Sequence, residues 1–153
     1  MAVLSWGKPK VEFAITPASG DPKDWEEMPE IKEDSAALDV TEGELIEATE
    51  EGGAVVDSRR KANKYKFSFD IYLKKGKTKP ITDVNGVINE NFAVRLTPQD
   101  PACEGFIMRK TNVTVSERWT AAEGMLVRYT FDGIKPSDDA NAKICDSYIA
   151  PTT

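Results

Sequence analysis

The segment from Lys64 to Leu73 alternates strictly between apolar and more polar positions over ten residues. The apolar positions are Tyr65, Phe67, Phe69, Ile71 and Leu73. The intervening positions are Lys66, Ser68, Asp70 and Tyr72. Because successive side chains of a β-strand point to opposite faces, this pattern predicts a strand with one buried face and one solvated face. A chain containing such a segment must build an amphipathic sheet around it.

Shorter versions of this pattern recur along most of the chain and predict a mainly antiparallel β fold. Further strands are expected at 10–15, 36–40, 43–51, 54–58, 92–97, 105–119 and 125–131. A weaker strand at 25–31 contains Pro29 and is therefore expected at a sheet edge or in a loop. The pairs Gly52-Gly53 and Asn85-Gly86 predict tight hairpin turns, and the longest hairpin is expected to turn at 120–124.

One short helix is expected near the end of the chain. Ser137-Asp138-Asp139 follows Pro136 and is typical of a helix N-cap. Ala140, Ile144 and Tyr148 then recur at a spacing of four residues, which is one helical turn. The expected organisation is a single domain over residues 1–153, with an N-terminal arm at about 1–9 and a long loop at about 74–90.

The absence of histidine removes most common catalytic designs. The 153 residues include no His and only two Cys, which excludes histidine-dependent triads, histidine metal sites and four-cysteine zinc sites. We therefore expect no enzyme, no cofactor and no bound metal. Cys103 and Cys145 are expected to be free thiols in a reducing compartment. No apolar run approaches the roughly 20 residues of a membrane span, and Met1 to Trp6 lacks a basic leader, so no membrane contact is expected.

Charge is distributed in two adjacent blocks of opposite sign. Between Asp21 and Glu51, thirteen acidic residues face two lysines, a net charge of −11. Between Asp57 and Lys79, nine basic residues face two aspartates, a net charge of +7. One interpretation is two solvated faces that partly neutralise each other within one fold. The other is self-association, in which the acidic surface of one copy meets the basic surface of another.

Two stretches resemble phage major tail tube proteins. Residues 40–57, the Arg59-Arg60-Lys61 link and residues 65–72 resemble the middle of that family, and residues 119–136 resemble its last hairpin. The resemblance is one of overall layout and covers roughly Ala36 to Pro136. Type VI secretion tube proteins share the fold of this family, so a tube subunit of that kind is a second possibility.

The resemblance implies a fold and a structural role. The fold would be a β-sandwich or partial barrel with one short helix. Copies would form hexameric rings that stack into a tube, and DNA would pass through the channel without specific binding. Partners would be other copies of the chain and other tail proteins, first in the bacterial cytoplasm during assembly and then in the virion tail.

A channel that passes DNA should be acidic or neutral, because lysine and arginine bind phosphate. The candidates for the channel lining are Glu44, Glu47, Glu50 and Glu51. Strand alternation prevents all four from facing the channel together. The candidates for contacts between subunits are Arg59, Arg60, Lys61 and Lys64.

A carbohydrate- or ligand-binding β-sandwich is the competing function. Trp25 or Trp119 would be its aromatic platform, although tryptophan more often anchors a core or an interface. Such a module predicts a stable monomer instead of rings or tubes.

Overall fold

The regular structure of the described residues consists entirely of antiparallel strands. The computed structural model describes residues 7–18, 20–76, 78–137 and 142–151, and these contain no helix. The strands are β1 (Lys10–Ile15), β2 (Glu26–Glu27), β3 (Ala37–Thr41), β4 (Leu45–Thr49), β5 (Val55–Arg60), β6 (Lys64–Tyr72), β7 (Phe92–Thr97), β8 (Gly105–Thr120), β9 (Gly124–Gly133) and β10 (Asp146–Tyr148).

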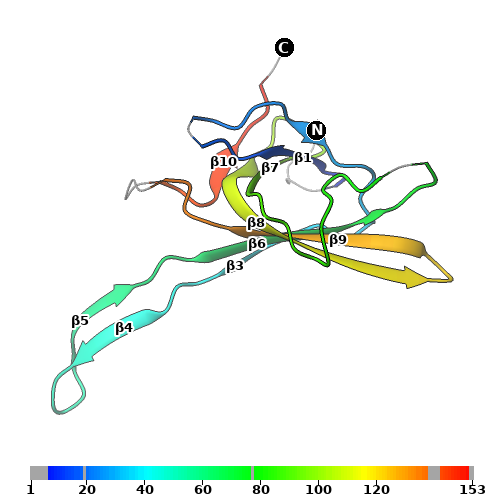
Figure 1. Ribbon diagram of the computed structural model, residues 1–153. Helices are drawn as coiled ribbons and strands as arrows, with labels where there is room; N and C mark the ends of the chain where they lie inside the picture. Colours follow the sequence, from blue (N-terminus) through cyan, green and yellow to red (C-terminus); the bar gives the residue numbers. More distant parts are fainter. Residues whose placement is uncertain (1–6, 19, 77, 138–141, 152–153) are drawn as a thin grey trace.

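Eight of these strands form one sheet in the order β2-β1-β7-β8-β9-β6-β3, with β10 beside β8. The long strand β8 joins two parts of this sheet. Its first half pairs with β7 as far as Thr111, and its second half pairs with β9 from Thr111 to Thr120. Figure 1 shows β8 curving from the layer of β1 and β7 to the layer of β6 and β9. The bend lets one sheet cover both sides of a common core.

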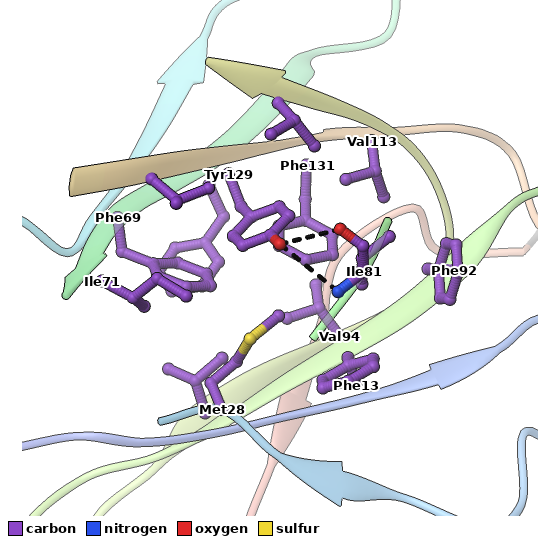
Figure 2. Close-up of a cluster of buried hydrophobic side chains, with 14 of the residues drawn as sticks. Phe13, Met28, Phe69, Ile71, Ile81, Phe92, Val94, Val113, Tyr129 and Phe131 are labelled. Carbon is purple, nitrogen blue, oxygen red and sulfur yellow. Dashed lines mark hydrogen bonds between the residues drawn. The ribbon is translucent and has the colours of Figure 1, made fainter. Parts of the chain in front are cut away.

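The core lies between these two layers (Figure 2). The residues that supply most of it are Val11 and Phe13 from β1, Phe67, Phe69 and Ile71 from β6, Val94 from β7, Val113 and Val115 from β8, and Val127, Tyr129 and Phe131 from β9. In β6 the buried apolar residues are those of the predicted apolar face, and Tyr65 and Leu73 at its ends are half-buried. The predicted amphipathic strand is therefore confirmed.

One buried polar side chain joins the loop at 74–90 to this core. The hydroxyl of Tyr129 donates a hydrogen bond to the carbonyl of Ile81 at 2.8 Å and accepts one from its N–H at 3.3 Å. Ile81 itself is buried among the core residues. The middle of this loop is thus fastened to the sheet, because a buried peptide group needs hydrogen-bond partners.

The segment after β2 connects the two ends of the sheet. Its Met28 N–H donates to the carbonyl of Val11 in β1, and Ile31 forms an isolated bridge with Ile71 in β6. The same short segment therefore contacts strands that are far apart in the sheet order. Pro29 lies between these contacts, which agrees with the prediction that this region is an edge or a loop.

The three predicted hairpins are present. β4 and β5 pair across Gly52-Gly53, and β8 and β9 form the long hairpin. Asn85 and Gly86 have φ values of 52° and 83°, and Val84 and Val87 exchange backbone hydrogen bonds of 3.0 and 2.9 Å. Positive φ at both central residues is the type I′ geometry that Asn-Gly favours.

The predicted C-terminal helix is wrong for the described residues. Asp146, Ser147 and Tyr148 form β10, which pairs with Ile107, Phe106 and Gly105 of β8. Residues 138–141 of the expected helix lie outside the described residues. The four-residue spacing does not correspond to a helix here. The backbone groups of this segment form their hydrogen bonds with the first residues of β8 instead.

Candidate functional site

The hairpin of β4 and β5, with its flanking residues Glu44 and Lys61, projects from the rest of the molecule and is here called the arm (Figure 1). Every residue of β5 is exposed, and β4 has only one half-buried residue, Ile46. Leu45, Val55 and Val56 are 42%, 52% and 62% exposed. Because these apolar side chains have no core to cover, the arm is a surface suited to a partner.

A tight junction joins the arm to the sheet. β3 and β6 pair as far as Thr41 and Lys64, and the pairing resumes at Leu45 and Arg60. Gly43 lies between them, and a Cβ at this position would be 1.7 Å from the carbonyl oxygen of Lys61. Only glycine fits this approach, because the obstructing atom belongs to the backbone. The Gly43 N–H also donates to Oδ1 of Asn63 at 3.0 Å.

The acidic candidates for the channel lining all belong to the arm, but they do not form one surface. Glu47 lies in β4, Glu44 precedes it, and Glu50 and Glu51 lie in the connection to β5. Within the strand alternation, Glu47 and Glu44 point to opposite faces of the hairpin. The structure therefore brings these acids to one arm without grouping them on one side.

The basic candidates lie beside the acids along the same hairpin. Arg60 approaches Glu42 at 3.9 Å, and Lys61 approaches Glu44 at 3.4 Å. Arg59 is opposite Ile46 across the hairpin, and Lys64 begins β6. The acidic and basic blocks thus partly neutralise each other within one copy, as the first of the two interpretations predicted. These exposed pairs contribute little stability.

A second candidate surface is the outward side of β3, β6, β9 and the second half of β8, here called the polar face. Its positions, taken strand by strand, are Ala37, Asp39 and Thr41; Lys64, Lys66, Ser68, Asp70 and Tyr72; Leu126, Arg128, Thr130 and Asp132; and Asn112, Thr114, Ser116 and Arg118. Three of these positions carry an apolar or aromatic side chain: Ala37, Tyr72 and Leu126. Of these, Leu126 is buried. A sheet whose second face is this hydrophilic can border water.

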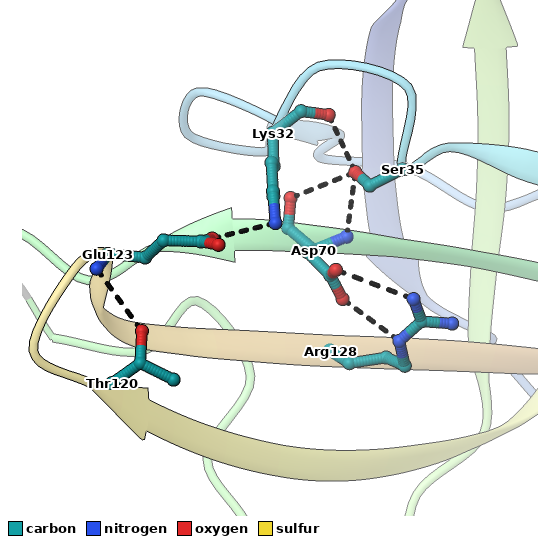
Figure 3. Close-up of polar contacts among 6 residues, drawn as sticks. All are labelled: Lys32, Ser35, Asp70, Thr120, Glu123 and Arg128. Atoms are coloured by element: carbon teal, nitrogen blue, oxygen red, sulfur yellow. Dashed lines mark hydrogen bonds and ion pairs between the residues drawn. The ribbon is translucent and has the colours of Figure 1, made fainter.

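Charges on the polar face are mixed and partly paired (Figure 3). Arg128 Nε lies 2.9 Å from Asp70 Oδ1, and these residues are cross-strand partners. The Asp70 backbone N–H donates to Ser35 Oγ at 3.1 Å, and its carbonyl accepts the Lys32 N–H at 2.8 Å. Asp70 therefore holds the segment after β2 against β6 while its carboxylate neutralises Arg128.

The tip of the β8–β9 hairpin is fixed by a second set of polar contacts (Figure 3). Lys32 Nζ lies 2.7 Å from Glu123 Oε2, and this hydrogen bond lowers the pKa of Glu123 and raises the pKa of Lys32. The Glu123 N–H donates to Oγ1 of Thr120 at 3.2 Å. Beside this ordered turn, Trp119 is 66% exposed. An exposed tryptophan on a fixed hairpin is the kind of side chain that anchors interfaces.

The other described tryptophan has an intramolecular partner. The Arg95 guanidinium lies 4.2 Å from the Trp25 ring centre and 5.1 Å from that of Tyr148. Arg95 also donates two hydrogen bonds of 3.1 Å to the Glu12 carboxylate. The cation occupies one side of the Trp25 ring, so this ring is a poor sugar platform. Trp6 lies outside the described residues.

The described residues offer little for catalysis or metal binding. They contain no group of three or more His, Cys, Asp or Glu side chains arranged to hold a metal ion. Cys145 is half-buried, and burial together with Asp146 raises the pKa of its thiol, which makes it less reactive. Within the part of the chain that the structure describes, no helix has the length and apolar character needed to cross a membrane.

No protein-family model matches the chain, and no curated protein matches it either. The arm and the polar face are therefore the candidate functional surfaces. The second parity of 64–73 indicates the part of the polar face that lies in β6, whereas the parts from β3, β8 and β9 depend on the strand order.

Proposed function

We propose that this chain is a structural subunit that assembles with copies of itself into rings and tubes, as phage tail tube proteins do. The observation that carries the proposal is the polar face together with the two free edges of its sheet. In this interpretation each copy supplies one sector of a larger barrel, and its own bent sheet is a partial barrel with tail-tube-like architecture. The chain would act as a building block and not as an enzyme.

The two free edges suit ring formation. No described strand pairs with β3 on the side away from β6, and none pairs with β8 beyond Thr111 on the side away from β9. The sheet between these edges has four antiparallel strands, so its two edge strands run in opposite directions. Copies added head to tail would therefore continue the antiparallel pattern, and closure into a ring would remove both exposed edges.

The polar face suits the lining of a water-filled channel. Its side chains are short hydroxyl and amide groups interspersed with acids and bases, and Asp70 balances Arg128. Strong binding of DNA would require clustered lysine and arginine. A mixed and nearly balanced lining would let DNA pass without holding it. We therefore assign the channel lining to the polar face and the arm acids to contacts between copies.

The arm suits contacts with a neighbouring copy. It extends beyond the end of the sheet and presents both charge signs beside exposed Val55 and Val56. An arm of this kind would join one ring to the next, and other tail proteins would meet the ends of the tube. The expected setting is the bacterial cytoplasm during assembly and then a virion tail. A type VI secretion tube would use the same construction.

Negative-stain microscopy of concentrated, purified protein tests this proposal. We expect rings or tubes with a central hole. Uniform monomers that are retarded on polysaccharide gels would contradict it and would favour a carbohydrate-binding module that uses Trp119.

The contact made by the arm has its own test. Arg59→Glu reverses a charge that has no ion-pair partner within 4 Å among the described residues, and it should shorten the tubes or abolish stacking without unfolding the monomer. Lys135→Glu, at an exposed position after β9, is the matched control outside the arm and the polar face. Tubes that form normally with Arg59→Glu and persist at high salt would contradict an electrostatic role for the arm, because exposed pairs are screened over about 8–10 Å.

A further inference from the structure

We infer that β3 of one copy pairs with residues 116–120 of β8 in the next copy, with Asp39 opposite Arg118. The inference rests on the proposed function and names the contact that would close its rings. It follows from two free strand edges, their matching side chains and the offset between them.

The β3 edge is free and its side chains are largely unprotected. Four of its five residues are exposed, and only Leu38 is half-buried. Val40 is 48% exposed although it points to the same side of the sheet as the core residues. The β3 edge therefore presents unpaired backbone groups next to an apolar side chain that lacks a full set of neighbours, which is the condition for adding another strand.

The complementary edge is the last part of β8. The loop at 74–90 flanks this strand with its backbone as far as Val115, whose carbonyl oxygen would lie 3.6 Å from a Cβ placed on Gly86, and beyond that only its Lys79 side chain reaches the carboxylate of Glu117. No described backbone group bonds to Ser116–Thr120 from the side away from β9. This free stretch has five residues, the same length as β3, and it contains the exposed Trp119.

Side-chain chemistry selects the register. Asp39 and Arg118 both lie on the polar face, and neither has an ion-pair partner within 4 Å among the described residues. Pairing them places Leu38 opposite Trp119 and Val40 opposite Glu117 on the other side of the sheet, with Val40 also diagonal to Trp119 and Glu117 still paired with Lys79 of its own copy. A shift by one residue would put charged side chains on the apolar side, so alternation forbids it. The register gives Leu38 and Val40 an apolar neighbour in Trp119, and it gives Asp39 and Arg118 each a counter-ion.

The offset between the two edges is compatible with a closed barrel. Within one copy, Asp39 is in line with Lys66, Asp132 and Asn112 across the four strands. Arg118 lies six residues beyond Asn112 along β8. That offset is about 20 Å along the strand direction, and four strands spaced about 4.8 Å apart extend a similar distance across the sheet. The ratio of these two distances corresponds to a strand tilt of about 45°. Barrels adopt tilts of about 35–45°.

The receiving edge is already ordered before a partner arrives. Lys32, Glu123 and Thr120 fix the turn that follows Trp119. Leu73 at the end of β6 donates its N–H to the carbonyl of Met125 in the facing strand. A rigid edge loses little conformational freedom on binding, so the pairing needs only a modest interface in each copy.

Cysteine cross-linking tests the register directly. Asp39→Cys and Arg118→Cys would be introduced together in a chain whose Cys103 and Cys145 are replaced by alanine. Under mild oxidation of assembled protein, we expect a ladder of covalent multimers on denaturing gels. The matched control combines Asp39→Cys with Asn112→Cys, the residue that pairing without the offset would place opposite. This control should give no ladder.

Exchange of charges provides a second measurement that does not depend on oxidation. Asp39→Arg alone and Arg118→Asp alone should each reduce assembly at least tenfold, and the double variant should restore most of it. This register is wrong if wild-type protein forms tubes but the 39–118 cysteine variant gives no ladder. It is also wrong if the 39–112 variant gives a ladder. In both cases the proposed function stays intact. Wild-type protein that never assembles would overturn the proposed function and the register together.

Discussion

The arm and the sheet are built from the same continuous pair of chain segments, yet they differ in what holds them. β3 and β6 pair across one end of this long hairpin, and β4 and β5 pair across the other. β6 buries Phe67, Phe69 and Ile71 against the second layer, whereas β5 buries nothing. Hydrogen-bonded pairing alone gives little stability to a two-stranded ribbon in water. The comparison shows that burial supplies the stability of the sheet, while the arm keeps its apolar side chains exposed.

The largest expected effect comes from removing a core ring. Phe69 is fully buried and lies 5.9 Å from Phe131 and 6.1 Å from Tyr129 between ring centres. Phe69→Ala should lower the free energy of unfolding by about 3–5 kcal/mol, because transfer and cavity costs add. Val56→Ala in the arm should change it by less than about 0.5 kcal/mol. Urea denaturation measures both, and equal effects would remove the distinction between sheet and arm.

The next effect concerns the buried hydroxyl that fastens the loop. Tyr129→Phe leaves the N–H and carbonyl of Ile81 without their partner and should cost about 1–3 kcal/mol of unfolding free energy. Chemical denaturation at neutral pH measures this cost. An unchanged midpoint would mean that other groups satisfy Ile81.

The same hydroxyl predicts a pH dependence. Burial raises the pKa of Tyr129 from 10.0 to about 12. Its contribution is therefore fully present below pH 10 and is lost as the pH rises towards 12, with a slope of about 1.4 kcal/mol per pH unit. Tyr129→Phe should lack this slope. If the wild type and the variant lose stability in parallel between pH 10 and 12, Tyr129 is not the source of the pH dependence.

A smaller and more local effect is expected at the junction. Gly43→Ala places a Cβ against the carbonyl oxygen of Lys61, so the strands must separate there. We expect amide exchange in β4 and β5 to accelerate, with a loss of about 1 kcal/mol or less in global stability. Hydrogen-exchange mass spectrometry measures both regions. Acceleration throughout the sheet would show that arm and sheet unfold as one unit.

The smallest effect is expected from an ion pair of the arm. Lys61→Met removes the partner of Glu44, but both side chains are more than 60% exposed. The change in unfolding free energy should be less than about 0.5 kcal/mol and should disappear at high salt. Thermal unfolding at low and high salt measures it. A larger loss would mean that the arm depends on its own charges for its conformation.

The strands were predictable because alternation is a local signal. The positions of β1, β6, β7, β8 and β9 follow from side-chain parity within each segment, and the turns at Gly52-Gly53 and Asn85-Gly86 follow from backbone freedom. The helix was mispredicted because a four-residue spacing over a short stretch does not exclude an extended chain. Tyr148 lies beside Arg95, and Asp146 bonds to Arg109 at 3.5 Å. These contacts come from distant parts of the sequence.

The candidate surfaces were less predictable than the strands. The acid-rich segment and the basic segment were visible as charge blocks, but their pairing within one hairpin depends on the register of β4 with β5. The polar face assembles residues from four strands, and its outermost members in the sequence, Ala37 and Asp132, are 95 positions apart. No local pattern indicates which strands will be neighbours in a sheet.

The sequence by itself determined the antiparallel β class, the buried parity of β6 and the opposite signs of two adjacent charge blocks. Each of these depends on spacing or composition within one segment, where backbone geometry fixes which side chains share a face. The tertiary structure decided that the charge blocks lie along one projecting arm and that the polar parities of four strands form one surface. It also left the edges of β3 and β8 free. These outcomes depend on strand order and on the bend of β8, which arise from contacts between distant segments around a common core.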